Sequence, residues 1–199
     1  TIRPASSGGF SVGIYLISAA SGNVFSGNTI TTNGTSANAG IRFDTGANNN
    51  TVTNNTISTN GSSTNNKGIL LNVGPSGNLI FGNNITTNGT GTDIGIQLLT
   101  GANNNTIASN IIVTKSGPSF GFHILQSNYS VFANNTITTT DSRSFGVQIE
   151  SSGADTTGNI FYNNIFNTTA RHVNVTDNRS VNNFSISTYS ATNIVGGAT

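Results

Sequence analysis

Hydrophobic and polar residues alternate in short segments along the chain, and the alternation follows two frames that recur in turn. The first frame is N-x-Φ-x-x-N-x-I, where Φ is an apolar residue, and its first copy runs from Asn23 to Ile30. The second frame is G-Φ-x-Φ, and its first copy runs from Gly13 to Leu16. Alternation with a period of two is typical of half-buried β-strands, so the sequence predicts many short strands.

Both frames repeat at a nearly constant interval. Later copies of the second frame begin 25 to 28 residues apart, at Gly40, Gly68, Gly95, Gly121 and Gly146, and a seventh copy at His172 replaces the glycine. A single coil of this length cannot bury its apolar face alone, but stacked coils form a continuous core. The repeat therefore predicts a β-solenoid with two or three strands in each turn.

The second Asn of the first frame is present in all six copies: Asn28, Asn55, Asn83, Asn110, Asn135 and Asn164. Asn tolerates left-handed backbone, which suits a bend after a strand. Stacked amides can also hydrogen-bond to the coils above and below. We therefore expect an internal Asn ladder. A last copy of the frame, from Arg179 to Ile186, keeps the apolar positions Val181 and Ile186. Phe184 stands at its ladder position, so the ladder is expected to end before this copy.

This spacing resembles the repeat of right-handed parallel β-helix proteins, which include pectate-lyase-like enzymes, NosD-like proteins and many archaeal and bacterial surface proteins. The resemblance implies an all-β, right-handed parallel β-helix of about seven coils at residues 10–186. Residues 1–9 are then an irregular lead-in, and residues 187–199 are a tail or docking strand. The fold hosts lyases, hydrolases, epimerases, adhesins and spacers, so the resemblance does not imply one activity.

Composition excludes several classes of protein. Only 7 Lys and Arg and 6 Asp and Glu are present, with a net charge of +1 and no basic stripe, which argues against nucleic-acid binding. No apolar run approaches the length of a membrane span. The chain has no Cys, so disulfides and thiolate metal sites are excluded. It begins at Thr1 and has no Met, so we expect a processed form or a piece of a longer product.

Catalytic groups are sparse in the expected columns. Asp44 and Glu150 share a column but lie four coils apart, about 19 Å at 4.8 Å per coil, whereas a glycosidase pair needs about 5–10 Å. His123 and Glu150 lie on adjacent coils, about 8 Å apart at the spacing of neighbouring strands, and are not expected to form a dyad. A NosD likeness implies copper, which prefers His, Met or Cys, but His123 and His172 fall in different columns. We expect no catalytic residue, metal or cofactor.

Two surface features remain. Asn33, Asn60 and Asn88 each precede Gly in an N-x-S/T sequon at one turn register, so they are glycosylation candidates, although Asn-Gly is also ordinary turn chemistry. Thr pairs such as Thr29 and Thr31 recur on one outer face. Flat arrays of this kind resemble ice-binding surfaces, but Ile and Val interrupt this one, and Thr is a common strand residue.

The pattern favours a non-catalytic extracellular structural protein, because nearly every regularly spaced residue builds the coil. We expect a cell-surface subunit of a surface layer, sheath or filament, or an adhesin stalk. Its partner is expected to be another copy, joined head to tail, or another surface protein. The alternative is a carbohydrate-binding or carbohydrate-active module of the pectate-lyase-like class, with polysaccharide lying along Arg42, His123 and Glu150.

Overall fold

The structure is a computed structural model that describes residues 1–2, 9–115, 117–176, 182–185 and 194–195. These residues form β-strands and no α-helix, so none of the described segments is a helix able to cross a membrane. The strands make three parallel sheets. The eight-stranded sheet contains β1 (Val12–Leu16), β4 (Ala39–Asp44), β7 (Lys67–Asn72), β10 (Ile94–Leu99), β13 (Phe120–Leu125), β16 (Phe145–Glu150), β19 (Val173–Val175) and β21 (Ile194–Val195).

The other two sheets close each turn. The seven-stranded sheet contains β2 (Val24–Ser26), β5 (Thr51–Thr53), β8 (Leu79–Phe81), β11 (Thr106–Ala108), β14 (Val131–Ala133), β17 (Ile160–Tyr162) and β20 (Asn183–Ser185). The six-stranded sheet contains β3 (Thr29–Thr32), β6 (Thr56–Thr59), β9 (Asn84–Thr87), β12 (Ile111–Thr114), β15 (Thr136–Thr139) and β18 (Ile165–Thr168).

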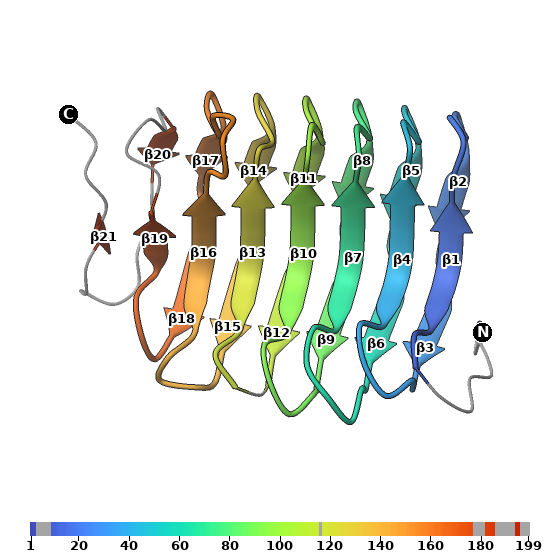
Figure 1. Ribbon diagram of the computed structural model, residues 1–199, viewed down its shortest axis with the longest axis horizontal. Coiled ribbons are helices and arrows are strands. Elements are labelled where there is room, and N and C mark those ends of the chain that lie inside the picture. Colours follow the sequence, from blue (N-terminus) through green and yellow to red (C-terminus); the bar gives the residue numbers. More distant parts are fainter. Residues whose placement is uncertain (3–8, 116, 177–181, 186–193, 196–199) are drawn as a thin grey trace.

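Each turn of the chain uses one strand from every sheet, and strands β1 to β18 make six complete turns before β19 and β20 begin another. In Figure 1 the chain rises along the eight-stranded sheet, nearer the viewer. It then crosses the top and descends behind while advancing from right to left, which makes a right-handed coil. This architecture confirms the predicted parallel β-helix, with six complete described turns against an expectation of about seven.

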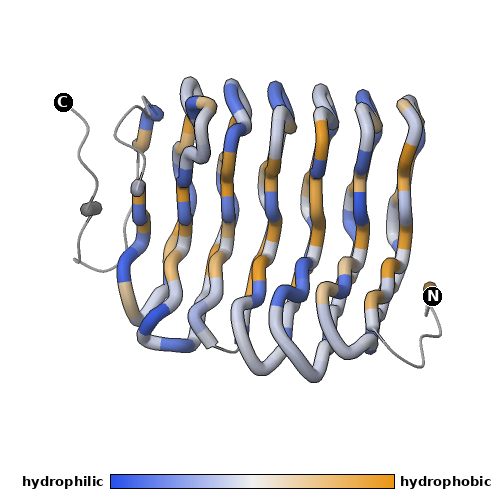
Figure 2. The backbone as a smooth tube through the Cα atoms, viewed as in Figure 1, coloured by the Kyte–Doolittle hydropathy of each residue, from blue (hydrophilic) through white to orange (hydrophobic). Residues whose placement is uncertain are grey.

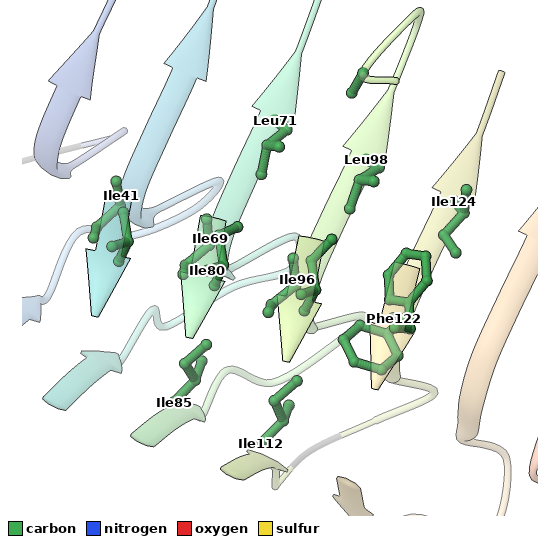
Figure 3. Close-up of a cluster of buried hydrophobic side chains, with 14 of the residues drawn as sticks. Ile41, Ile69, Leu71, Ile80, Ile85, Ile96, Leu98, Ile112, Phe122 and Ile124 are labelled. Carbon is green, nitrogen blue, oxygen red and sulfur yellow. The ribbon is translucent and has the colours of Figure 1, made fainter. Parts of the chain in front are cut away.

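The two sequence frames correspond to different sheets. The G-Φ-x-Φ frame forms the eight-stranded sheet, and the longer frame forms the other two sheets with a corner between them. Figure 2 shows hydrophobic and hydrophilic residues alternating along the strands of successive turns, and the apolar positions of both frames are mostly buried. Figure 3 shows the resulting rows, in which Ile69, Ile96 and Phe122 of the eight-stranded sheet face Ile85 and Ile112 of the six-stranded sheet. All five side chains are buried.

The glycine of the second frame is explained by a close approach between two sheets. A Cβ atom on Gly95 would overlap the side chain of Ile112 and lie 2.6 Å from the carbonyl oxygen of Gly121. The same conflict occurs at Gly40 with Ile57 and at Gly68 with Ile85. These glycines are therefore needed for space, so that the six-stranded sheet can pack against the eight-stranded one.

The six Asn side chains of the longer frame form one row through the corner between the seven- and six-stranded sheets. Asn83 illustrates the geometry: its Nδ2 donates to Asn110 Oδ1 (3.0 Å) and to the carbonyl of Val52 (3.0 Å). Its Oδ1 accepts from the backbone N–H (2.9 Å) and Nδ2 (3.0 Å) of Asn55. Asn28 is half-buried, and the other five are buried. Each amide thus satisfies polar groups in two coils.

Two further polar rows occupy the remaining corners, in addition to the predicted Asn ladder. One uses the first Asn of the longer frame and contains Asn23, Asn50, Asn78, Asn105, Ser130, Asn159 and Asn182. The other lies two residues before each glycine of the second frame and contains Ser11, Asn38, Asn66, Asp93, Ser119 and Ser144. Buried polar side chains therefore hold neighbouring coils together at all three corners.

The sequence predicts left-handed backbone at the ladder Asn, and this prediction is wrong. The left-handed residue is the one directly before the ladder Asn. Positive φ angles occur at Asn54 (54°), Gly82 (66°), Ser109 (56°) and Asn134 (54°), each directly preceding a ladder Asn. The αL residue makes the bend, which leaves the next residue free to turn its amide into the core. Asn at the αL position and Asn in the ladder therefore have different roles, although they are often adjacent.

The expected register of the last copy was also wrong. Phe184 does not stand at the ladder position, because β20 pairs Phe184 with Phe161, the apolar Φ position of the turn before. The two rings stack with centroids 4.5 Å apart. Asn182 accepts from Asn159 and therefore belongs to the row of first Asn residues. Val181, Ile186 and most of the expected tail lie outside the described residues, whereas β21 pairs with β19 of the same chain.

Candidate functional site

The charged side chains of the described strands gather on one face of the coil. Arg42, Asp44, Lys67 and Glu150 lie on strands of the eight-stranded sheet, and no described strand of the other two sheets carries a charged residue. His123 occupies the same outward column as Arg42, through the register of β4, β7, β10 and β13. The outer face of the eight-stranded sheet is therefore the candidate for a catalytic or binding site.

The first group on this face, the Arg42 cluster, consists of Tyr15, Arg42, Asp44 and Asn72. The buried Asp44 carboxylate accepts from Tyr15 Oη (3.0 Å), Arg42 Nε and Asn72 Nδ2 (2.6 Å). The Arg42 guanidinium also lies 5.4 Å from the ring centroids of both Phe10 and Tyr15, within the range of cation–π attraction. Asp44 is thus held by three donors from three neighbouring turns.

The electrostatics of this cluster favour ion pairing over proton transfer. The hydrogen bond that Tyr15 donates to Asp44 raises the pKa of the phenol, because the ionised phenol could no longer donate. Asp44 faces a guanidinium that stays protonated at all ordinary pH values. The Asp44 carboxylate is buried and already accepts three hydrogen bonds, so its contacts within the protein are those of an ion pair that holds neighbouring coils together.

The second group, the His123 network, consists of Gln97, His123, Gln148, Glu150 and Asn174. His123 Nε2 lies 3.3 Å from Glu150 Oε2, and Gln97 Nε2 lies 2.8 Å from His123 Nδ1. Gln148 Nε2 donates to Glu150 Oε1 (3.1 Å), and Asn174 Nδ2 donates to Gln148 Oε1 (2.7 Å). The network crosses four adjacent strands, β10, β13, β16 and β19.

These contacts pair both nitrogens of the His123 ring. With the Gln97 amide nitrogen placed against it, Nδ1 of the neutral ring accepts, and Nε2 then carries the proton and donates to Glu150. Burial lowers the pKa of His123, and the nearby Glu150 carboxylate opposes this effect. Both ring nitrogens are occupied within the protein, so the neutral imidazole has no free lone pair for a substrate or a metal.

The contact between His123 and Glu150 corrects the expected separation of about 8 Å at the strand spacing. Strand spacing alone overestimated the distance because both side chains are long and lean toward each other across adjacent coils. Asp44 and Glu150 nevertheless remain in separate clusters, four strands apart in one column. The face therefore holds two self-contained polar groups.

The glycosylation candidates Asn33, Asn60 and Asn88 lie in the turns that follow β3, β6 and β9, and all three are exposed. Asn60 Nδ2 lies 3.2 Å from Asn33 Oδ1, so the first two candidates stack on each other at the surface. Exposure makes each of them accessible to a glycosylating enzyme, while their proximity limits how many can carry a bulky glycan at once.

The fold and this face define a parallel β-helix protein with an outward polar sheet. A family described as "Periplasmic copper-binding protein (NosD)" matches residues 4–116 and 56–199, so the chain belongs to the NosD family. The chain is also similar to a crystal structure of a double mutant of the periplasmic alginate epimerase AlgG, at 13% identity and a TM-score of 0.60. That match covers 91% of this chain and 47% of the epimerase, and it supports the fold alone. No curated protein matches.

The side chains of this chain do not fit the copper named in the family description. Cys and Met are absent from the sequence, and only two His are present. The His123 ring is occupied by Gln97 and Glu150, while His172 is buried, with Nδ1 lying 2.9 Å from Thr168 Oγ1. Over the described ranges no three His, Asp or Glu side chains come together as a metal site. Copper prefers soft or imidazole ligands, and this chain offers no such set.

Proposed function

We propose that the chain is a non-catalytic structural β-helix located outside the cytoplasm, as a subunit of a surface layer, sheath or filament or as the stalk of an adhesin. The observation that carries the proposal is the use of its polar side chains. Three rows of amides and hydroxyls connect each coil to the next by hydrogen bonds, and on the eight-stranded sheet Arg42 pairs with Asp44 and His123 with Glu150. These contacts tie the described coils into one rigid unit and occupy the Asp44 carboxylate and both nitrogens of the His123 ring.

The location outside the cytoplasm is supported by the comparisons. The NosD family description is periplasmic, and the similar epimerase is also a periplasmic protein. A chain without Cys is compatible with an oxidising compartment, since it has no thiol to oxidise. Fractionation of the source cells tests this point: the protein is expected outside the cytoplasmic membrane, and recovery with a cytoplasmic marker would contradict the proposal.

Self-association is the second part of the proposal. Charged residues make up 7% of the chain and the net charge is +1, so little repulsion keeps copies apart. Sedimentation velocity over a wide concentration range is the test. The proposal expects larger species to form reversibly as concentration rises, and a monodisperse monomer at every concentration would overturn it.

The absence of catalysis is tested with polysaccharides. Purified protein is incubated with neutral and uronate-containing polymers, and the products are followed by ultraviolet absorbance for lyase activity, reducing ends for hydrolysis and nuclear magnetic resonance for epimerisation. The proposal expects no turnover above that of heat-denatured protein. Turnover that disappears in His123→Gln or Arg42→Gln would contradict it and would favour an enzyme.

A second candidate function is saccharide binding on the eight-stranded sheet, and the Arg42 cluster favours it. The exposed rings of Phe10 and Tyr15 flank a guanidinium that is itself partly exposed. Aromatic faces and a guanidinium fork suit a sugar that carries a carboxylate. Affinity electrophoresis in gels containing uronate or neutral polymers tests this candidate: retardation by the uronate polymer that is lost in Arg42→Gln would favour it, and equal mobility would remove it.

Glycosylation of Asn33, Asn60 and Asn88 is proposed for a source that possesses N-glycosylation. Neighbouring coils are only about 4.8 Å apart, so bulky glycans on Asn33 and Asn60 would collide. We expect no molecule to carry glycans on both adjacent sites. Intact-mass analysis of the native protein decides this point. Bare Asn at all three sites would refute the proposal, and glycans on all three sites of one molecule would refute the expectation that adjacent sites exclude each other.

A further inference from the structure

Both ends of the described coil are partly covered by the chain itself. At the first turn, Ile2 lies against β3, where its N–H donates to the Thr29 carbonyl (2.7 Å) and its carbonyl accepts from Thr31 (3.0 Å). At the other end, β21 adds to the edge of β19. A second copy stacked end to end would have to displace these pairings, so an end-on contact has competition within the chain.

The outer faces of the seven- and six-stranded sheets have a different character, and we call them the uncharged faces. None of their described strands carries Asp, Glu, Lys, Arg or His, and Thr, Ser and Asn supply most of their polar positions. Large apolar side chains stand exposed among them: Val24, Leu79, Phe81, Ile111, Ile160, Tyr162 and Ile165. An exposed apolar surface without charges is what soluble monomers normally avoid.

We infer that the uncharged faces are the surface through which copies of this chain associate side by side. This inference rests on the self-association proposed above and names the surface that carries it. A second copy fits better than an unrelated partner, because the ridges of both faces repeat at the strand spacing of about 4.8 Å, and only a surface with the same repeat interdigitates along its full length. The faces offer no charge to attract an oppositely charged partner.

The size of the faces predicts how the copies associate. The six-stranded sheet presents about 29 Å along the axis and, at four residues per strand, about 13 Å across it, or roughly 380 Å². The seven-stranded sheet, with three residues per strand, presents roughly 340 Å². A stable pair of proteins usually buries about 800 Å² on each partner. One face is therefore too small for a durable dimer, whereas a copy in an array uses both faces.

Lysine substitutions on the two faces test the inference. The test variant carries Ile111→Lys and Leu79→Lys, which place a charge on an exposed position of each uncharged face, on β12 and β8. The matched control is Val73→Lys, since Val73 lies in the turn after β7 and is 49% exposed, close to the 52% of Ile111. Circular dichroism and the melting temperature establish that each variant is folded. Assembly is then measured by sedimentation velocity at increasing concentration.

The expected result is reversible assembly of the unmodified chain and of Val73→Lys without a discrete dimer, and at least a tenfold higher concentration for assembly of the double variant. If the unmodified chain and the double variant assemble alike, these faces are not the interface, although self-association stands. If the unmodified chain remains monomeric, the proposed self-association fails and the inference fails with it. Assembly only in the presence of an insoluble polysaccharide, lost in the double variant, would replace the second copy with that polymer and overturn the inference.

Discussion

Replacing Asn83 by Leu tests the polar row in the corner between the seven- and six-stranded sheets. Leu has a similar size but makes none of the amide contacts. The change removes the acceptor of the buried Asn55 backbone N–H and the hydrogen bonds from Asn83 Nδ2 to Val52 and Asn110. A stranded buried donor costs about 1–3 kcal/mol, and each remaining lost hydrogen bond costs about 1 kcal/mol. We expect the free energy of unfolding to fall by about 3–5 kcal/mol.

The assay is urea unfolding followed by circular dichroism. The matched control is Asn84→Leu at the next position, the first residue of β9, because Asn84 is exposed and Asn83 is buried. A surface substitution of this kind changes stability by about 0.5 kcal/mol or less. If Asn83→Leu and Asn84→Leu have the same unfolding midpoint as the unmodified chain, the row contributes nothing to stability and the reasoning is wrong.

Three further predictions follow from the described geometry. Gly95→Ala should cost about 3 kcal/mol, because its methyl group overlaps Ile112 and the Gly121 carbonyl oxygen. Gly27→Ala, at a φ of 67° with no atom within 4 Å, should cost about 1–2 kcal/mol, and equal midpoints of the two variants in thermal unfolding would contradict this. Burial lowers the pKa of His123, so the stability that comes from its neutral form is fully present above the unfolded pKa of about 6.5 and is lost as pH falls from there through the lower pKa of the folded state. His123→Gln should flatten the dependence of urea midpoints on pH below about 6.5, and an unchanged slope would contradict this. Equilibrium dialysis against Cu(I) and Cu(II) should leave no copper that survives a chelator, and retention of one equivalent would contradict the ligand analysis.

Much of the fold could be predicted because the frame repeats. Ile85 and Ile112 mark the same position in successive coils, and a period of 27 residues between them fixes which residues stack. The Asn ladder could be predicted for the same reason, since Asn83 and Asn110 keep that spacing. Repetition replaces the long-range information that a single sequence normally lacks.

The remaining errors share a physical origin. The αL position was assigned to the ladder Asn because Asn suits both roles, and only the backbone shows that Asn54 bends while Asn55 stacks. The register of the last coil differs from the expected one because Phe184 follows its partner Phe161 by 23 residues, whereas earlier Φ positions are 25 to 29 residues apart, so counting from Ile186 places Phe184 in the wrong column. Counting along columns locates a Cα atom and not the end of a side chain, which is why the contact between His123 and Glu150 was missed.

The polar row that contains Asp93 could have been predicted from its constant position in the repeat. Asn38, Asn66 and Asp93 each stand two residues before the glycine of the second frame. Asp93 differs from the other members of the row because its side chain is a carboxyl group. Burial raises the pKa of Asp93, and hydrogen bonds from Asn66 and Gly89 oppose this rise without cancelling it. Ser, Asn and Asp can all form hydrogen bonds at this position, although they are different residue types. A search for one recurring residue type therefore overlooks the row.

Electron cryomicroscopy of the concentrated, purified chain tests the central claim most directly, because it shows both whether copies assemble and which surfaces meet. The account predicts β-helices lying side by side, with the outer faces of the seven- and six-stranded sheets buried between copies and the Arg42 cluster and His123 network facing solvent. Isolated monomers, or assemblies in which the eight-stranded sheet is buried and the uncharged faces are exposed, would contradict it.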